Sequence, residues 1–176
     1  PGVYFTLNPV NPDLLARANN RGKKYAKETT ADVDVLTRRW FPIDFDAKRP
    51  AGISSTDAEH EAALARARTC REWLGSQDWP APIFADSGNG AHLLYRIDLP
   101  SEDRNLVAQS LKALAARFDD TEVVVDVGNY NPARIWKIYG TLAAKGDSVP
   151  ERPHRLARIL DEPEMIPVTL DKLEAL

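Results

Sequence analysis

The sequence predicts an α+β fold in which two helices cover one face of a β-sheet. From residue 40 onward the segments follow the order strand, helix, strand, strand, helix, strand, strand. Both helical segments are long and carry an apolar stripe, and such stripes are buried against a sheet. We therefore expect an α+β sandwich with the helices on one face and the other face open, where it can carry polar groups.

The first 37 residues predict little regular structure. Residues 2–9, GVYFTLNP, have the pattern of a short strand that ends at an Asn-Pro pair, and residues 11–20 fit one short helix. Residues 19–37 are rich in charge and show no core face, so we expect a loop there.

The first strong strand is RWFPIDFD, residues 39–46. Strand side chains alternate between the two faces of a sheet. Ile43 and Phe45 can therefore be buried on one face, while Asp44 and Asp46 project together from the other. A lone D-x-D pair also fits a solvated edge strand, so the pair needs support from elsewhere in the chain.

Residues 54–76 and 101–118 have helical periodicity. Thr56 followed by Glu59 predicts a capping box at the start of the first helix, and Ser101 is the expected cap of the second. The predicted core faces are Ala63, Ala67, Cys70 and Leu74 in the first helix and Val107, Leu111, Leu114 and Phe118 in the second.

The remaining strands follow the two helices. Residues 83–86 and 92–97 predict a hairpin around the turn Ser-Gly-Asn-Gly, with His92 on the same strand face as Leu94 and Arg96. Residues 121–127, TEVVVDV, and 133–141, ARIWKIYGT, complete the set of predicted strands.

Length and composition predict a single domain. The 176 residues fit one domain, 1–176, in which residues 159–176 are a C-terminal tail of loops, an edge strand and a helical turn.

Because the chain begins with Pro1, we expect it to be part of a longer protein. Its single cysteine, Cys70, excludes an internal disulfide and fits a reducing cytoplasm. No apolar run approaches the roughly 20 residues needed to cross a membrane, so we expect no membrane partner.

A third carboxylate strengthens the case for a metal site. Asp126 interrupts VVVDV, a run that otherwise has the composition of a buried strand, and an unpaired buried carboxylate is costly. If Asp126 shares a cleft with Asp44 and Asp46, a cation is needed to offset the charge. Three carboxylates form a hard oxygen site that suits Mg²⁺ or Mn²⁺, and two such ions serve phosphoryl and nucleotidyl transfer.

The turn before His92 predicts contact with phosphate. Gly88 and Gly90 allow backbone N–H groups to approach an anion, while Ser87 and Asn89 add polar side chains. The pattern is not that of a P-loop. A hydrogen-bonded structural histidine is an equally common explanation for His92 alone, and the adjacent turn favours contact with a triphosphate.

Residues 134–158 form a basic stretch in an acidic chain. They contain six Lys or Arg against two acids, whereas the whole chain has a net charge of −3. A solvated face explains such an imbalance as well as a track for triphosphate or template does. Arg134, Lys137 and Lys145 are the candidates near the acids, and strand parity leaves open which of the first two faces the cleft. Tyr130 is the aromatic expected to stack on a base, and Arg152 and Arg155 are further candidate DNA contacts.

Three of these motifs together resemble the archaeo-eukaryotic primase superfamily, in its phage and plasmid primase-polymerase branch. That superfamily has a hydrophobic strand with D-x-D, then a small-x-His motif, then a single acid on a hydrophobic strand. Here the motifs are FPIDFD, SGNGAH and VVVDV, in that order. The flanking NPARIWKIYGT and the later RPHR are similar to the same branch, and the likeness covers residues 3–158.

The resemblance implies an RRM-like catalytic sheet with a small accessory α/β part. It implies a DNA primase/polymerase domain that uses Mg²⁺ or Mn²⁺, a single-stranded DNA template with its primer, and (deoxy)nucleoside triphosphates. Some members of the superfamily carry a zinc-binding module, but this chain has one Cys and three His and lacks the residues to build one, so we expect no zinc. It also implies a helicase domain in the same replication protein, in the cytoplasm of a bacterium or a phage-infected cell. Carried over by position, the metal ligands are Asp44, Asp46 and Asp126, the triphosphate contacts are Ser87 and His92, and the phosphate or template contacts are Arg134, Lys137 and Lys145.

Two alternatives use the same residues differently. A metal-dependent nuclease could employ Asp44, Asp46, His92 and Asp126 as its catalytic set. A non-catalytic RRM-like module would also bind nucleic acid, but such modules usually carry aromatic residues on the open sheet rather than three carboxylates.

Overall fold

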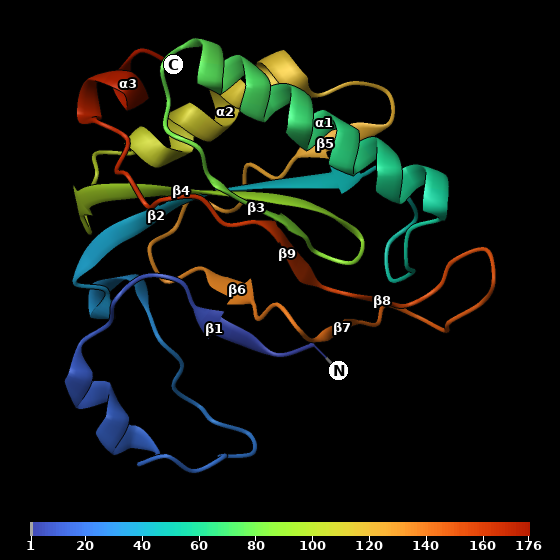
Figure 1. Cartoon of the computed structure of the whole chain (residues 1–176). Coiled ribbons are helices and arrows are strands. Elements are labelled where there is room, and N and C mark those ends of the chain that lie inside the picture. Colours follow the sequence, from blue (N-terminus) through green and yellow to red (C-terminus); the bar gives the residue numbers. More distant parts are fainter. Residues whose placement is uncertain (1) are drawn as a thin grey trace.

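The computed structural model describes residues 2–176, and its centre is a five-stranded antiparallel sheet in the order β5-β2-β4-β3-β9 (Figure 1). The helices α1 and α2 lie together on one face of this sheet, so the predicted α+β class and the placement of the helices are confirmed. The sheet strands are β2 (Thr37–Ala47), β3 (Ile83–Asp86), β4 (Gly90–Pro100), β5 (Val123–Val125) and β9 (Arg158–Asp161), and the α-helices are α1 (Asp57–Ser76), α2 (Leu106–Phe118) and α3 (Leu170–Glu174).

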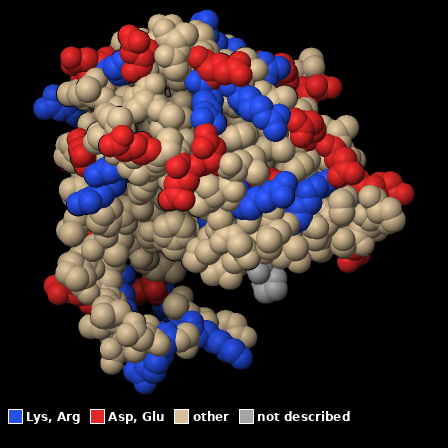
Figure 2. Space-filling view, in the orientation of Figure 1, with Lys and Arg blue, Asp and Glu red and all other residues tan. Residues whose placement is uncertain are grey.

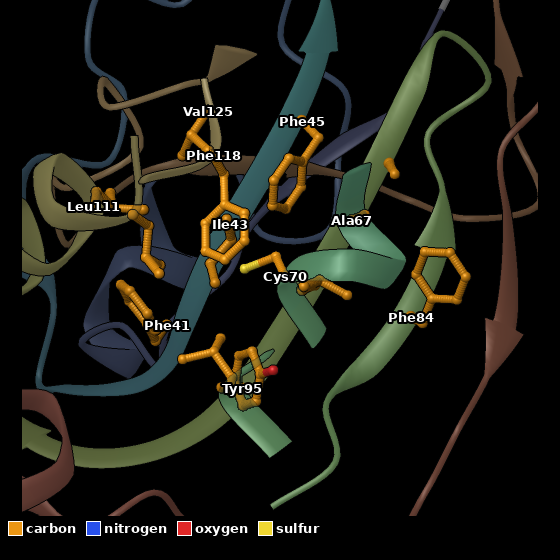
Figure 3. Close-up of a cluster of buried hydrophobic side chains, with 14 of the residues drawn as sticks. Phe41, Ile43, Phe45, Ala67, Cys70, Phe84, Tyr95, Leu111, Phe118 and Val125 are labelled. Atoms are coloured by element: carbon orange, nitrogen blue, oxygen red, sulfur yellow. The ribbon is translucent and has the colours of Figure 1, made fainter. Parts of the chain in front are cut away.

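The main hydrophobic core lies between the sheet and these helices (Figure 3). Strand alternation sends Phe41, Ile43 and Phe45 of β2 into it, where all three are fully buried. Alternate residues of β4 point into the same core. Both predicted helix faces are confirmed as buried, namely Ala63, Ala67, Cys70 and Leu74 in α1 and Val107, Leu111, Leu114 and Phe118 in α2.

The two helix starts differ in how well the sequence predicted them. The capping box is confirmed, because the Glu59 backbone N–H donates to the Thr56 hydroxyl and the Thr56 N–H donates to the Glu59 carboxylate. The cap expected at Ser101 is wrong, since α2 begins only after Asn105, which has a φ of 66°. The Asp103 carboxylate instead accepts a backbone N–H in the first turn of α2.

The face of the sheet away from the helices is not left open, contrary to the expectation. A second layer lies across part of it (Figure 1). The reason is that Leu94 on this face is apolar, and it packs with Leu7 and Trp136 in a second small buried cluster. The second layer consists of two two-stranded sheets, β1 (Tyr4–Thr6) with β6 (Ile135–Lys137) and β7 (Leu142–Ala143) with β8 (Arg155–Leu156).

The two ends of the chain largely follow expectation. The short helix expected at residues 11–20 is a 3₁₀ helix, Pro12–Arg17, and the loop expected at residues 19–37 contains one more 3₁₀ turn, Asp32–Asp34. The tail has the predicted edge strand, β9, and the terminal helix α3. None of the helices in the described part of the chain combines the length and apolar composition that crossing a bilayer requires.

The core position of Phe41 leads to a stability prediction. We expect Phe41→Ala to lower the free energy of unfolding by about 3–5 kcal/mol, because the ring is fully buried against Trp79. Urea unfolding followed by circular dichroism measures this loss. Phe5→Ala, at a residue that is 43% exposed, is the matched control and should lose much less. Equal losses would contradict this placement of the core.

Candidate active site

The strand β2, which lies between β5 and β4, places two carboxylates beside a histidine and a third carboxylate. Asp44 is the direct cross-strand partner of His92 on β4. On the other side of β2, the Asp126 backbone N–H donates to the Asp44 carbonyl at 2.8 Å, just beyond the last pair of β5. Directly opposed residues share a sheet face. Asp126, Asp44 and His92 therefore form one row across the sheet, with Asp46 two residues further along the same face of β2.

One pocket of about 310 Å³ collects most of the predicted site residues. It lies between this face of the sheet and the second layer, and its walls come from β1, β2, β4, β6 and the segments around β7. The predicted site residues that line it are Asp44, Asp46, Ser87, Asn89, His92, Asp126, Arg134, Lys137 and Lys145. Residues as far apart in the sequence as Tyr4 and Lys145 thus meet at one place.

The three carboxylates lie near one another, and their negative charges repel. Withdrawal of Asp44 from water raises its pKa well above the usual value, and the charges of Asp46 and Asp126 raise it further. Lys145 and Arg49 act in the opposite direction. The folded protein therefore holds a concentration of negative charge that a cation would stabilise.

Asp126 has its side chain oriented by the loop that follows it. The Gly128 backbone N–H donates to one carboxylate oxygen at 2.8 Å, and the Asn129 side-chain amide donates to the other at 3.1 Å. Asn129 is buried and lines the pocket, and the sequence reading did not select it. On the neighbouring strand, Asp46 accepts a hydrogen bond from Arg49 at 3.3 Å.

The donor set suits a hard divalent cation. Three carboxylates line one pocket, and oxygen ligands of this kind are those that Mg²⁺ and Mn²⁺ prefer. Within residues 2–176, no three His, Cys, Asp or Glu side chains are yet close enough together to hold one ion as they stand. Binding would therefore require the carboxylates to turn toward a shared ion.

His92 is a neutral hydrogen-bond donor in this pocket. Burial lowers the pKa of His92 to about 3, with a smaller effect of Lys137 in the same direction. The Tyr139 hydroxyl accepts the indole N–H of Trp136 at 3.0 Å and lies 2.9 Å from His92 Nδ1. An indole nitrogen can only donate, and among the described residues Nδ1 of His92 is the one acceptor within hydrogen-bond distance of the tyrosine hydrogen, so we assign this hydrogen to the contact with Nδ1. The ring proton of His92 then resides on Nε2, which lies 3.5 Å from the Asp44 carboxylate.

Strand alternation left open which of Arg134 and Lys137 faces the cleft, and in the structure both line the pocket. Arg134 precedes β6 and donates to the Gly128 carbonyl, while its Nε has no partner among the described residues. Lys137 ends β6 and donates to the Leu142 carbonyl at 3.1 Å. The strand β6 is only three residues long, so alternation along it does not separate the two side chains. With Lys145 they form a basic wall of the pocket.

The Ser-Gly-Asn-Gly turn is held by hydrogen bonds from its backbone N–H groups to nearby side chains. The Gly88 N–H donates to the buried Asp86 carboxylate at 2.6 Å, and the Gly90 N–H donates to the Ser87 hydroxyl at 2.9 Å. A side chain at Gly90 would collide with the Phe45 carbonyl oxygen of β2. The glycines thus permit close packing, while Ser87 and Asn89 are the turn residues that line the pocket. Contact of the turn with a nucleotide stays a prediction.

A buried pair braces this turn from the helix side. Asp86 lies 2.8 Å from His60 of α1 and is almost fully buried. Its hydrogen bonds to His60 and to the Gly88 N–H lower the pKa of Asp86 despite that burial. The contact ties α1 to the loop that carries Ser87, and only the tertiary structure reveals it.

Three predicted DNA contacts lie outside the pocket. Tyr130 lines a different cleft beside the start of α2, and its carbonyl accepts a hydrogen bond from buried Arg38. Arg152 forms an ion pair with Glu59, and Arg155 with Asp57, so both fasten the β7–β8 region to the start of α1. A role for these residues in DNA binding stays a prediction.

One aromatic residue in the pocket was missed by sequence reasoning. Tyr4 of β1 lines the pocket and is 51% exposed, and the Lys137 ammonium group lies 5.4 Å from its ring centroid. Residue 4 reaches the site only because β1 pairs with β6. No signal in the local sequence indicates such a pairing.

No family model, curated protein or solved structure matches the chain. The geometry of the pocket is therefore the basis for a functional conclusion.

The raised pKa of Asp44 leads to a pH prediction. The folded protein binds this proton more tightly than the unfolded chain does, so stability falls as the pH rises above the unfolded value of about 3.9. Asp44→Asn should therefore unfold at higher urea concentration than wild type near neutral pH without divalent cations. The difference should vanish below about pH 3.9. Exposed Asp147→Asn serves as the control, and a destabilised Asp44→Asn would refute the charge argument.

The contact between Tyr139 and His92 leads to a prediction about tautomers. Tyr139→Phe removes the hydrogen that Nδ1 of His92 accepts. We expect the ¹⁵N chemical shifts of the His92 ring to show the Nε2–H form in wild type and a mixture of both tautomers in the variant. Unfolding should cost about 1 kcal/mol less. Tyr130→Phe, outside the pocket, should leave the His92 shifts unchanged, and identical spectra for Tyr139→Phe would exclude the contact.

Proposed function

We propose that this chain is the catalytic domain of a DNA primase/polymerase, which adds nucleotides to a primer on a single-stranded template during phage or plasmid replication. The observation that carries the proposal is the meeting, in one pocket, of three carboxylates with a neutral histidine and a basic wall. The acidic and the basic residues lie on separate segments of the chain. A nucleoside triphosphate has some phosphate oxygens that bind metal ions and others that pair with Lys or Arg, so it requires both kinds of residue. The fold-level proposal is an RRM-like catalytic sheet with the second layer as its accessory part.

The carboxylates are the proposed metal ligands. Asp44, Asp46 and Asp126 would hold two Mg²⁺ or Mn²⁺ ions, whose positive charge offsets the mutual repulsion that raises the pKa of Asp44. When bound, such ions activate a 3′-hydroxyl group and stabilise charge on the departing pyrophosphate. The Gly128 and Asn129 hydrogen bonds orient the Asp126 carboxylate in the ion-free protein, and the carboxylate would turn from this position to reach a shared ion.

The remaining pocket residues are suited to the triphosphate. His92 carries a proton on Nε2 that can be donated to a phosphate oxygen, and its low pKa keeps this donor neutral at physiological pH. Arg134, Lys137 and Lys145 supply positive charge in the same pocket. Tyr4, half-exposed beside Lys137, can stack on the nucleotide base.

Primer extension tests this function directly. With a primed template, nucleoside triphosphates and Mn²⁺ or Mg²⁺, we expect the wild type to lengthen the primer. Asp44→Asn and Asp126→Asn should each reduce the rate by more than about a hundredfold, since mutation of residues that only hydrogen-bond a metal ligand already lowers metal affinity or activity by about 10–100-fold. Asp147→Asn is the control. Shortening of the primer would identify a nuclease and refute the proposal, and so would full activity of both variants.

Metal binding has a readout that does not depend on activity. Ligands that bind only the folded state raise the melting temperature. Mg²⁺ or Mn²⁺ should therefore raise the melting temperature of the wild type and of Asp147→Asn, and raise that of Asp44→Asn much less. Equal shifts in all three proteins would exclude Asp44 as a ligand.

A further inference from the structure

A loop before β2 projects from the body of the protein on the side of the sheet away from α1 and α2 (Figure 1). Its two ends are joined by backbone hydrogen bonds, from the Asn11 N–H to the Asp34 carbonyl at 2.8 Å and from the Leu36 N–H to the Pro9 carbonyl at 2.9 Å. The loop is thus closed at its base, while its far part lies in solvent, with nearly every side chain exposed. We call residues 14–27 the basic tip.

The basic tip concentrates positive charge in an acidic protein. It contains five Lys or Arg and no acid, so the remainder of the chain, which is −3 overall, carries −8. Arg17 is engaged at the base, 3.5 Å from Asp34. Lys23, Lys24 and Lys27 form no ion pair or hydrogen bond with any of residues 2–176. Figure 2 shows blue Lys and Arg side chains gathered on the lower projection, with acidic side chains near its base.

An exposed aromatic ring lies among these lysines. Tyr25 is 95% exposed, the largest value among the exposed large hydrophobic residues, and its backbone has a φ of 56°. A tyrosine in this left-handed conformation carries a conformational cost, and no packing of its ring within the protein offsets it. Aromatic rings between cations are the standard elements of surfaces that bind single strands, in which bases stack and phosphates pair with charge.

We propose that the basic tip binds single-stranded nucleic acid, with Lys23, Lys24 and Lys27 on the phosphates and Tyr25 stacked on an unpaired base. A single strand fits better than a duplex, because stacking requires an exposed base face and the remaining surface is net negative. The inference rests on the proposed function only in identifying the strand as the template. The basic tip would then bind the template at a site separate from the pocket but on the same side of the sheet.

Binding rather than catalysis tests this inference. Fluorescence anisotropy of labelled oligothymidine is measured against salt concentration for wild type, for the triple variant Lys23→Ala/Lys24→Ala/Lys27→Ala and for Tyr25→Ala. We expect the triple variant to reduce the slope of log affinity against log salt by about 2, since each phosphate contact on a single strand contributes about 0.7. We expect Tyr25→Ala to weaken binding by at least about fivefold with the slope unchanged.

A matched control removes equal charge elsewhere. Lys48→Ala/Arg68→Ala/Lys112→Ala changes three exposed cations outside the basic tip and should leave the slope at the wild-type value. All variants are checked for wild-type thermal unfolding. Three results would each overturn the inference. The control could lower the slope as much as the triple variant does, or duplex DNA could compete as well as a single strand. The third is that the protein binds anionic lipid vesicles through the basic tip but does not bind oligothymidine through it.

The two proposals can fail separately. If the wild type extends no primer but the variants of the basic tip lose oligothymidine binding as expected, the proposed function fails and this inference stands. If primer extension occurs and the variants bind like wild type, only this inference fails. Asp147→Asn, at an exposed residue outside the pocket and the basic tip, should bind oligothymidine like wild type in either case.

Discussion

The site depends on one constraint, which is that β2 carries the core on one face and carboxylates on the other. Phe41, Ile43 and Phe45 are fully buried against the helices, and this burial fixes the register of the strand. A slip of one residue would send Asp44 and Asp46 into the hydrophobic core. The apolar side of the strand therefore holds the two charges in place, at a free-energy cost to the folded state that the raised pKa of Asp44 reflects.

The neighbouring strands determine what those charges meet. Pairing on one side brings Asp126 next to Asp44, and pairing on the other side brings His92. A third acid increases the repulsion, whereas a histidine kept neutral by burial adds a donor without adding charge. The Tyr139 hydroxyl directs that donor toward the acids. The row thus combines concentrated negative charge with a neutral imidazole, an arrangement that a bound cation would stabilise.

The second layer turns this polar row into a pocket. Leu94 lies two residues from His92 on the same face of β4, and its burial with Leu7 and Trp136 brings β6 across the sheet. The same packing brings Arg134 and Lys137 to the pocket. The basic wall is therefore a consequence of apolar packing nearby, and the exposed loop before β2 extends positive charge further along the same side of the molecule.

The sequence by itself determined the local features of this protein. Alternation in RWFPIDFD separated Asp44 and Asp46 from the core, helical periodicity selected both buried faces, and the capping box marked the start of α1. These features need only neighbouring residues, so a single sequence contains them. The tertiary structure alone decided that residue 4 pairs with residue 137, that Tyr139 contacts His92, and that the second face is partly covered. Such contacts join segments far apart in the chain, and their formation depends on how all the apolar surfaces pack together, which no local pattern encodes.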